Sequence, residues 1–292
     1  MKIIGHTKTI NFLDNSIKHN NISHAYFFTG PEHIGKFSVA MRFARKIAGG
    51  QNQKINPNII VISPEIEEKR GIIRKKDIKI SSIRKLEKNL ALSPYFKKYK
   101  VAIIDDAERL TISAQNSLLK TLEEPNEKCI LILVCHNSEK ILTTVKSRCT
   151  IKKFNPISSS EIAQLVQDNQ NKEEIIFWSL GRPGIALMLE RDKEGLRARR
   201  EIQKEFRIIL ESHINDRFAQ AENLSKNIPK LIEKLNLWMI LLRENIFGRR
   251  ALLKITPAKS LALIDEINKS LKLIQETNSN SRLTLENLFL KF

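Results

Sequence analysis

The fold of this chain is decided by one stretch, Gly30-Pro31-Glu32-His33-Ile34-Gly35-Lys36-Phe37. It fits the phosphate-binding pattern G-x-x-x-x-G-K-[ST] at every position except the last. Its two glycines permit a backbone that turns its N–H groups toward phosphate oxygens, and Lys36 supplies a positive charge. Apolar residues 25–29 predict a buried strand before it, and the apolar spacing over 39–47 predicts a helix after it. This strand–loop–helix context favours a P-loop over a chance glycine-rich turn.

The last position of the motif departs from the pattern. A Ser or Thr there would place its hydroxyl on Mg²⁺, whereas Phe37 has no metal ligand to offer. Ser38 comes one residue late, and one residue on a helix is a rotation of about 100°. We therefore predict a nucleotide site that contains Gly30, Gly35, Lys36 and Phe37 but is impaired in hydrolysis.

Two carboxylates follow a second apolar run, residues 101–104. This is the form of a Walker-B strand, which is buried on both faces and delivers its acids at the carboxyl edge of a parallel sheet. Asp105 is placed to hold Mg²⁺, directly or through water. Asp106 stands where a glutamate usually polarises the attacking water, and its shorter side chain matters because a base must reach hydrogen-bond distance. The pair extends the predicted nucleotide site.

The alternation of strands and helices continues to about residue 157. Apolar runs at 59–62, 129–135 and 150–154 predict further strands, and the residues after the second run, from His136, should face the nucleotide edge. Ser81 or Ser82 is suited to cap the helix that follows a charged excursion over 65–80. Arg84 would then lie in its first turn, where N–H groups favour phosphate, although a solvated surface charge is the simpler explanation of Arg84.

Composition sets outer limits on the function. A chain of 292 residues accommodates two or three domains. The formal net charge of +18 suits a polyanionic partner such as nucleic acid, but a lysine-rich, hydrated surface accounts for it as well. No apolar run approaches the roughly 18 residues of a membrane span, and the N-terminus lacks a signal-peptide core, so we expect a cytoplasmic protein.

The three cysteines, Cys129, Cys135 and Cys149, form no C-x-x-C pair. Their spacing argues against a disulfide framework and against a cysteine-rich zinc site. Cys129 and Cys135 border a predicted strand and are better explained as core residues than as nucleophiles.

Beyond Pro156 the pattern becomes helical. Ser158 to Glu161 resembles a helix cap, and Gly181 to Gly184 interrupts a small helical unit. From about residue 192 long helical periodicities dominate, with Trp238 as a predicted core residue. We predict a doubly wound α/β domain over 1–157, a small helical unit over 158–191 and an all-α domain over 192–292.

Three segments together resemble the AAA+ clamp-loader family: Asp105-Asp106-Ala107-Glu108-Arg109-Leu110, Ala114-Gln115-Asn116-Ser117-Leu118-Leu119-Lys120-Thr121-Leu122-Glu123-Glu124-Pro125 and Ser147-Arg148-Cys149. Within it the chain is most similar to the delta-prime subunits of bacterial DNA polymerase III. The resemblance extends to Ile4-Gly5-His6, His24-Ala25-Tyr26 and the stretch from Asn280 to Leu288. It covers nearly the whole chain and is weakest from about 192 to 275.

The resemblance implies a RecA-like ATPase domain, a helical lid and a helical collar that joins five subunits in a ring around primer–template DNA. Partners would be the delta and gamma/tau subunits and the sliding clamp. In this family Ser147-Arg148-Cys149 carries an arginine finger, so Arg148 would reach the γ-phosphate held by a neighbouring subunit. A guanidinium is suited to this role because it forks onto phosphate oxygens and stabilises the charge of the transition state. A plain surface arginine is the alternative.

The departures from the hydrolysing members of the family agree with one another. Phe37 replaces the metal hydroxyl, Asp106 replaces the glutamate, and Gly184 stands where a lid arginine would contact the nucleotide, with Arg182 out of register. The family's four-cysteine zinc module has no counterpart between Gly49 and Pro57, so we predict no zinc and no other metal.

We therefore predict a delta-prime-like stator that keeps its finger while its own ATPase activity is absent or very weak, with ATP and Mg²⁺ at most weakly bound. Gly35, Lys36 and Asp105 leave open an ATP-hydrolysing gamma/tau-like motor. The net charge leaves open a basic AAA+-derived DNA-binding protein outside the clamp loader.

Overall fold

The computed structural model describes residues 3–49, 56–69, 72–95, 98–247, 253–277 and 279–292. They divide into two compact units, residues 1–190 and 191–292. The finer division into domains at 1–157, 158–191 and 192–292 stays a prediction. Residues 50–55 of the cysteine-free stretch between Gly49 and Pro57 lie outside the described residues.

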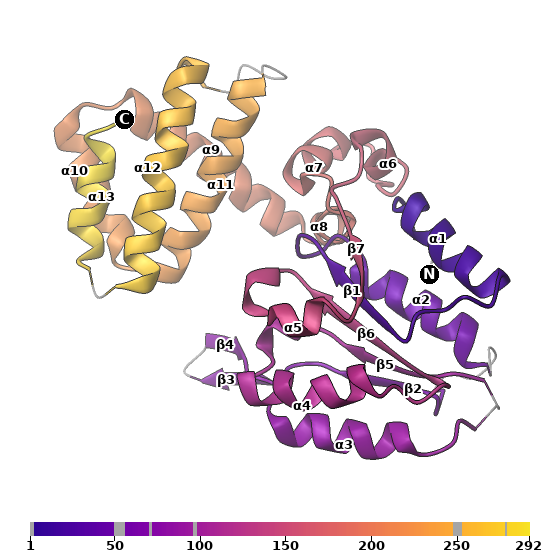
Figure 1. Ribbon diagram of the computed structural model, residues 1–292. Coiled ribbons are helices and arrows are strands. Elements are labelled where there is room, and N and C mark those ends of the chain that lie inside the picture. The colour runs from indigo at the N-terminus through magenta and orange to yellow at the C-terminus, as the bar shows by residue number, and fades with distance from the viewer. Residues whose placement is uncertain (1–2, 50–55, 70–71, 96–97, 248–252, 278) are drawn as a thin grey trace. The chain divides into compact units, whose positions relative to one another are not determined.

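A five-stranded parallel sheet forms the centre of the first unit, in the order β2-β5-β6-β1-β7 (Figure 1). Its strands are β1 (Ala25–Thr29), β2 (Ile59–Ile62), β5 (Lys100–Ile104), β6 (Cys129–Cys135) and β7 (Thr150–Lys153). Every residue of β5 and β6 is buried, as expected of central strands covered on both faces. The predicted α/β fold class is confirmed.

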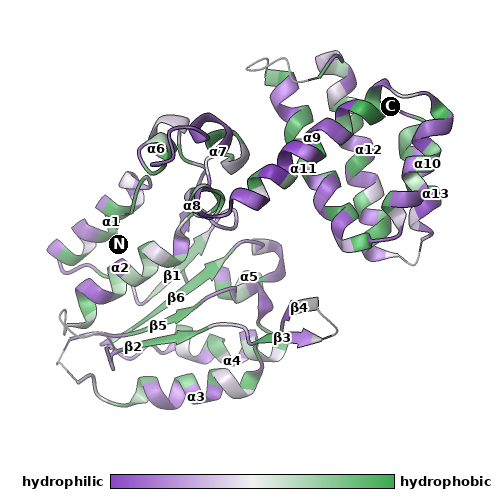
Figure 2. Cartoon of the chain, turned by 180° about the vertical axis from the view of Figure 1, so that it is seen from behind, coloured by the Kyte–Doolittle hydropathy of each residue, from purple (hydrophilic) through white to green (hydrophobic). Residues whose placement is uncertain are grey.

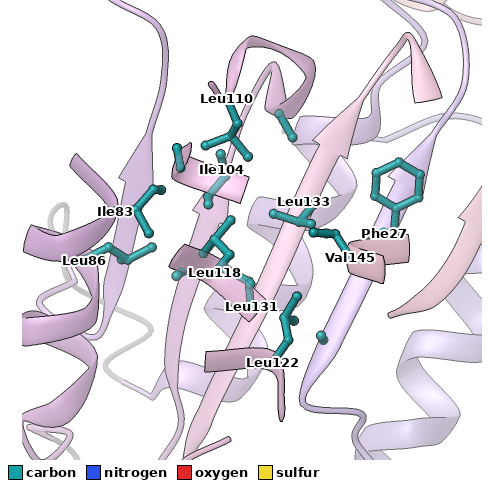
Figure 3. Packing of buried hydrophobic residues seen from close by; sticks show 14 of the residues in the cluster. Phe27, Ile83, Leu86, Ile104, Leu110, Leu118, Leu122, Leu131, Leu133 and Val145 are labelled. Carbon is teal, nitrogen blue, oxygen red and sulfur yellow. The ribbon is translucent and has the colours of Figure 1, made fainter. Parts of the chain in front are cut away.

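Helices cover both faces of this sheet. On one face lie α3 (Ile80–Ala91), α4 (Ile112–Glu123) and α5 (Thr143–Lys146), and on the other lie α1 (Thr7–Lys18) and α2 (Lys36–Ala48) (Figure 1). Successive strand residues point to opposite faces, so Ile104 and Leu133 pack with the first group of helices (Figure 3), whereas Ile103 and Ile132 pack with the second. Two buried cores therefore hold the sheet between two helical layers.

The charged excursion forms an antiparallel hairpin of β3 (Ile66–Lys69) and β4 (Ile72–Lys75). After it, Ile78 pairs with the segment before α4, donating to the carbonyl of Arg109 at 2.8 Å. This contact fixes the position of the chain just before the helix. As a result α3 begins at Ile80, with Lys79 as its N-cap, earlier than the serines predict. The prediction that Ser81 or Ser82 caps this helix is wrong because both lie inside it, and Arg84 lies beyond the first turn.

Short helices complete the first unit: the 3₁₀ turns η1 (Ala107–Arg109) and η2 (Ser138–Lys140), then α6 (Ser159–Ala163), α7 (Lys172–Ser179) and α8 (Pro183–Arg191). The predicted cap is confirmed, since Ser158 and Glu161 form a reciprocal capping box at the start of α6. Between α7 and α8, Gly181 has a φ of 70°, and a Cβ there would lie 2.4 Å from the carbonyl of Ile157.

The second unit is helical throughout its described residues, with α9 (Lys193–Glu211), α10 (Ile214–Ser225), α11 (Ile228–Phe247), α12 (Pro257–Glu276) and α13 (Ser281–Phe289). Its core includes Trp238, which is fully buried and stacks on Phe206 with ring centroids 4.8 Å apart. The core assignment of Trp238 is confirmed. Apolar residues concentrate in the sheet strands of the first unit, whereas the helices carry apolar and polar residues in turn (Figure 2). Of the helices described, none is long and apolar enough to cross a membrane.

Candidate functional site

The loop between β1 and α2 depends on its glycines. Gly30 has a φ of 149°, and a Cβ on it would lie 2.2 Å from the carbonyl oxygen of Phe154. Gly35 has a φ of 100° and forms the left-handed N-cap of α2, a conformation that side chains disfavour. The sequence therefore predicted the two positions where this turn requires glycine.

Lys36 is buried and bound to its own loop. Its Nζ donates to the carbonyl oxygens of Gly30 at 2.7 Å and Pro31 at 2.6 Å. Burial lowers the pKa of its ammonium, against the opposing effect of nearby carboxylates such as Glu108. The ammonium that would face a phosphate thus donates to two backbone oxygens instead. A nucleotide phosphate would have to replace these oxygens as its hydrogen-bond acceptors.

The two aspartates after β5 have different surroundings. Burial raises the pKa of Asp105, and the neighbouring charge of Asp106 raises it further. Asp106 adopts a left-handed backbone with a φ of 50°, and both of its carboxylate oxygens are engaged. Oδ2 lies 2.5 Å from Lys75 Nζ, and Oδ1 lies 3.2 Å from His136 Nε2. Asp106 is therefore held by two side chains rather than left to contact water.

His136 links Asp106 to a third carboxylate. Its Nε2 lies 2.7 Å from Oε1 of Glu108, and its backbone N–H donates to Oε2 at 3.3 Å. Burial alone would raise the pKa of Glu108, but the hydrogen bond from His136 lowers it to about 2. The same hydrogen bond raises the pKa of His136 against its own desolvation. The pair therefore favours a carboxylate and an imidazolium.

Sequence analysis missed Lys75 and Glu108 as members of this cluster. Lys75 was assigned to an exposed excursion, but the hairpin carries its Nζ to Asp106 and to 3.6 Å from Oε1 of Glu32 in the P-loop. No local pattern signals such a contact. The sequence placed Glu108 in a family motif but gave it no role at this site. The position of His136 was predictable, because His136 directly follows a strand that ends at this edge of the sheet.

A cavity of about 350 Å³ opens beside these groups, a size found in small-molecule sites. It brings together most of the predicted nucleotide residues, and its lining includes Gly35, Lys36, Phe37, Asp105 and Asp106. Phe37 is half-buried and packs against the core beneath α2, so this position of the loop offers the cavity an apolar ring in place of a metal-binding hydroxyl.

The start of α8 contacts the glycine loop directly. Gly184 donates its N–H to the carbonyl of His33 at 2.8 Å, and a Cβ on Gly184 would lie only 2.8 Å from that oxygen. The position predicted to have lost a lid arginine therefore has no room for a side chain in this arrangement.

These residues fit the phosphate part of a magnesium nucleotide better than the Mg²⁺ part. The glycine loop and Lys36 have the form of a phosphate cradle, once Lys36 leaves its carbonyl partners. The Mg²⁺ part does not fit, since Phe37 supplies no oxygen and the carboxylate of Asp106 faces an ammonium, Lys75, and an imidazole, His136, rather than further oxygen ligands. Asp105 remains as one carboxylate for Mg²⁺.

Arg148 lies apart from this cavity, whose lining among the described residues includes none of Ser147, Arg148 and Cys149. Its guanidinium forms an ion pair with Oε1 of Glu123 at 2.7 Å and donates to the carbonyl of Thr144 at 3.0 Å. The Arg148 side chain is partly exposed, at 36%, and that of Glu123 is exposed, at 49%.

The two residues beside Arg148, Ser147 and Cys149, contact their own part of the protein. Ser147 Oγ donates to the carbonyl of Thr144 at 3.0 Å. Burial raises the pKa of Cys149 to about 12, so this thiol is not a nucleophile at neutral pH.

A buried glutamine fixes the segment that leads to Arg148. Gln115 of α4 is 2% exposed, and its side chain accepts from the N–H of Leu142 at 2.8 Å while donating to the carbonyls of Lys140 and Leu110. Its amide is thereby fully engaged, as a buried polar group requires.

Arg84, the predicted phosphate contact, is exposed on α3 and outside the cavity lining.

A family model described as DNA polymerase III, delta subunit, matches residues 5–158. The chain is 33% identical over 166 residues to DNA polymerase III subunit tau of Bacillus subtilis, covering 55% of this chain and 30% of that protein. It is 30% identical over 160 residues to the replication factor C small subunit of Methanocella arvoryzae, covering 55% and 46%. The matches thus span less than half of each of these two relatives.

The solved structure of a DNA polymerase III gamma subunit-related protein from Thermotoga maritima also aligns with the chain. The TM-score is 0.52 at 18% identity, over 95% of this chain and 97% of that one. At this identity the likeness supports the fold, an α/β sheet domain followed by helices.

Proposed function

The chain belongs to the family described as DNA polymerase III, delta subunit, among the AAA+ clamp loaders, and on that premise we propose that it is a delta-prime-like stator. In this role the subunit helps to load the sliding clamp onto primed DNA without hydrolysing ATP itself. Its contribution to hydrolysis is Arg148, supplied in trans to a neighbouring ATPase subunit.

One observation carries this proposal: Asp106 and Phe37, at positions needed for hydrolysis in cis, are engaged elsewhere, while the candidate finger is partly exposed. Asp106 is paired with Lys75 and His136, and Phe37 offers no metal ligand. Among the described residues, the contacts of the Arg148 guanidinium are a surface ion pair and one carbonyl. Such surface pairs contribute about 0–1 kcal/mol, so exchange of Glu123 for a phosphate is inexpensive.

The mechanism follows from the chemistry of the guanidinium. Arg148 would release Glu123 and fork onto the oxygens of the γ-phosphate in the neighbouring site, where negative charge is spread over the transition state. A nucleotide bound in its own cavity would meet the phosphate cradle of Gly35 and Lys36. Mg²⁺, if present there, would find Asp105 and supply charge neutralisation at the phosphates.

The decisive experiment measures ATP turnover by a reconstituted clamp loader in which one ATPase site is intact, the site that Arg148 would reach. In every other ATPase site the P-loop lysine is substituted. With Arg148→Ala in this subunit, we expect turnover at the remaining site to fall by roughly 10³-fold, the effect of losing an arginine finger. Arg148→Lys should restore little, because an ammonium does not form the planar fork.

The matched control is Arg45→Ala, which removes an exposed arginine from α2. It should leave turnover unchanged, which separates the finger from general loss of charge. The isolated wild-type chain should show no turnover. Full turnover by the complex with Arg148→Ala would contradict the proposal.

A motor subunit is the second candidate, favoured by the open cavity beside Lys36 and Asp105. It predicts ATP turnover by the isolated chain that Lys36→Ala abolishes. The curated relatives include a DNA polymerase III tau subunit, so this test is worth making alongside the first.

The remaining assignments extend the proposal. Residues 1–157 would act as the ATPase-like domain, 158–191 as the lid and 192–292 as the collar that joins delta and gamma/tau subunits. The net charge of +18 suits contact with primer–template DNA inside the complex, with Arg84 as one phosphate contact. Strongly salt-dependent DNA binding by the lone chain, without assembly, would instead indicate a DNA-binding protein outside the clamp loader.

A further inference from the structure

Asp106, Glu108 and His136 bring three potential metal ligands together where β5 and β6 end. One ligand atom from each lies within 4.8 Å of the other two, and His136 Nε2 is 2.7 Å from Glu108 and 3.2 Å from Asp106. Zn–N and Zn–O bonds of about 2.0–2.2 Å in tetrahedral geometry place adjacent ligand atoms roughly 3.3–3.6 Å apart. An ion therefore requires small shifts of these side chains and the release of the proton that His136 Nε2 shares with the carboxylates.

The cluster is enclosed by protein but open on one side. The side chains of Asp106 and Glu108 are 9% and 6% exposed, while Asp106 and His136 line the cavity of about 350 Å³. An ion bound here would have three protein ligands and one open position toward the cavity. That is the coordination pattern of a site able to take water or an oxygen ligand.

The local charge also favours a cation. Four carboxylates line or adjoin the cavity, and two lysines oppose them; the groups are Glu32, Asp105, Asp106, Glu108, Lys36 and Lys75. Lys75 contacts Oδ2 of Asp106 and leaves Oδ1 directed to His136. By holding Oδ2, Lys75 would orient the carboxylate so that Oδ1 binds the ion. Hydrogen bonds to metal ligands orient them in this way in known metal sites.

We propose that Asp106, Glu108 and His136 form a site for a divalent transition-metal ion. An imidazole with two carboxylates suits ions such as Zn²⁺, Co²⁺ and Mn²⁺, whereas Mg²⁺ prefers oxygen ligands alone. The site is distinct from the place that Asp105 would offer Mg²⁺, and it departs from the prediction of a chain without metal. It does not depend on the stator role.

Titration of the full chain with Co²⁺, followed by visible d–d absorption and by calorimetry, tests the site. We expect one saturable Co²⁺ per chain, displaced by Zn²⁺. His136→Gln and Glu108→Gln should each weaken binding on the order of 10- to 100-fold or more, since each removes a direct ligand. His19→Gln, at an exposed histidine beyond α1, is the matched control and should bind as wild type.

Asp105→Asn separates this site from the Mg²⁺ position and should leave Co²⁺ binding intact. Far-ultraviolet circular dichroism establishes that each variant is folded, and if His136→Gln is not, Glu108→Gln decides. The site is overturned if no saturable absorption develops, if the folded ligand variants bind as wild type, or if Asp105→Asn abolishes binding. None of these results bears on Arg148, whose role rests on turnover in the complex.

Discussion

The charged groups beside the cavity and those around Arg148 differ in how far they are exposed to solvent. In the cavity, Asp106 is nearly enclosed and shared between Lys75 and His136. At the other position, Arg148 and Glu123 pair in contact with solvent. Removing one partner of a buried pair costs about 3–5 kcal/mol, whereas an exposed pair is worth about 0–1 kcal/mol. The cavity is thus fixed mainly by the pairs that Asp106 and Glu108 form with His136, and the guanidinium is free to change partner.

The strongest test of this contrast is Glu108→Ala. Glu108 is 6% exposed, and its loss leaves His136 without its shortest hydrogen bond. We expect a loss of about 2–3 kcal/mol in the free energy of unfolding of the first unit. Hydrogen exchange of the β5 and β6 amides measures this opening separately from the second unit.

Glu139→Ala provides the comparison for that variant, because Glu139 is an exposed carboxylate in the nearby 3₁₀ turn η2. Its effect should stay within about 0.5 kcal/mol. Equal effects of the two substitutions would mean that the internal pairs do not fix the cavity.

The next largest effect is a pH dependence that resides in His136. Its pKa is raised above 6.5, so its contribution to stability is complete below pH 6.5 and is lost as pH rises through the raised pKa. The pKa of Glu108 is lowered from 4.5 to about 2, so its contribution is complete above pH 4.5 and is lost as pH falls toward 2.

The joint contribution is therefore greatest between about pH 4.5 and 6.5. Above that range the wild-type chain should lose about 1 kcal/mol, the difference between a charge-assisted and a neutral hydrogen bond. His136→Gln should remove this decline, measured by urea denaturation at a series of pH values. A decline that persists in the variant would assign it to other groups.

Lys75→Met should have a smaller effect, because the Lys75 side chain is 41% exposed. Its hydrogen bond to Asp106 raises the pKa of the ammonium, but water screens the pair. We expect a loss below about 1 kcal/mol by the same hydrogen-exchange measurement. A loss as large as that of Glu108→Ala would place Lys75 among the groups that fix the cavity.

Local sequence patterns predicted some of the features that these tests probe and not others. The strands were predictable because central strands are covered on both faces and appear as continuous apolar runs, as Cys129–Cys135 does. The turns at Gly30 and Gly35 were predictable because only glycine suits their backbone.

Contacts between distant segments were not predictable in this way. Lys75 reaches Asp106 from a hairpin 31 residues earlier, and nothing in the spacing of charged residues indicates it. The start of α3 was misplaced for the same reason, since Ile78 is fixed by the segment at Arg109 rather than by a local cap. The motif containing Arg148 was visible from the sequence, but its partner Glu123 depends on how α4 and α5 pack.

The smallest expected effect belongs to Glu123→Gln. This substitution keeps the size of the side chain and removes only the charge that holds Arg148, so stability should change by no more than about 0.5 kcal/mol. Turnover by the reconstituted complex should stay within about twofold of wild type, because the exposed pair contributes so little to the position of the guanidinium. The Thr144 carbonyl remains as a second partner for Arg148. Loss of turnover comparable to that of Arg148→Ala, without loss of assembly, would mean instead that Glu123 positions the finger, and the contrast between a fixed cavity and a free guanidinium would fail at this residue.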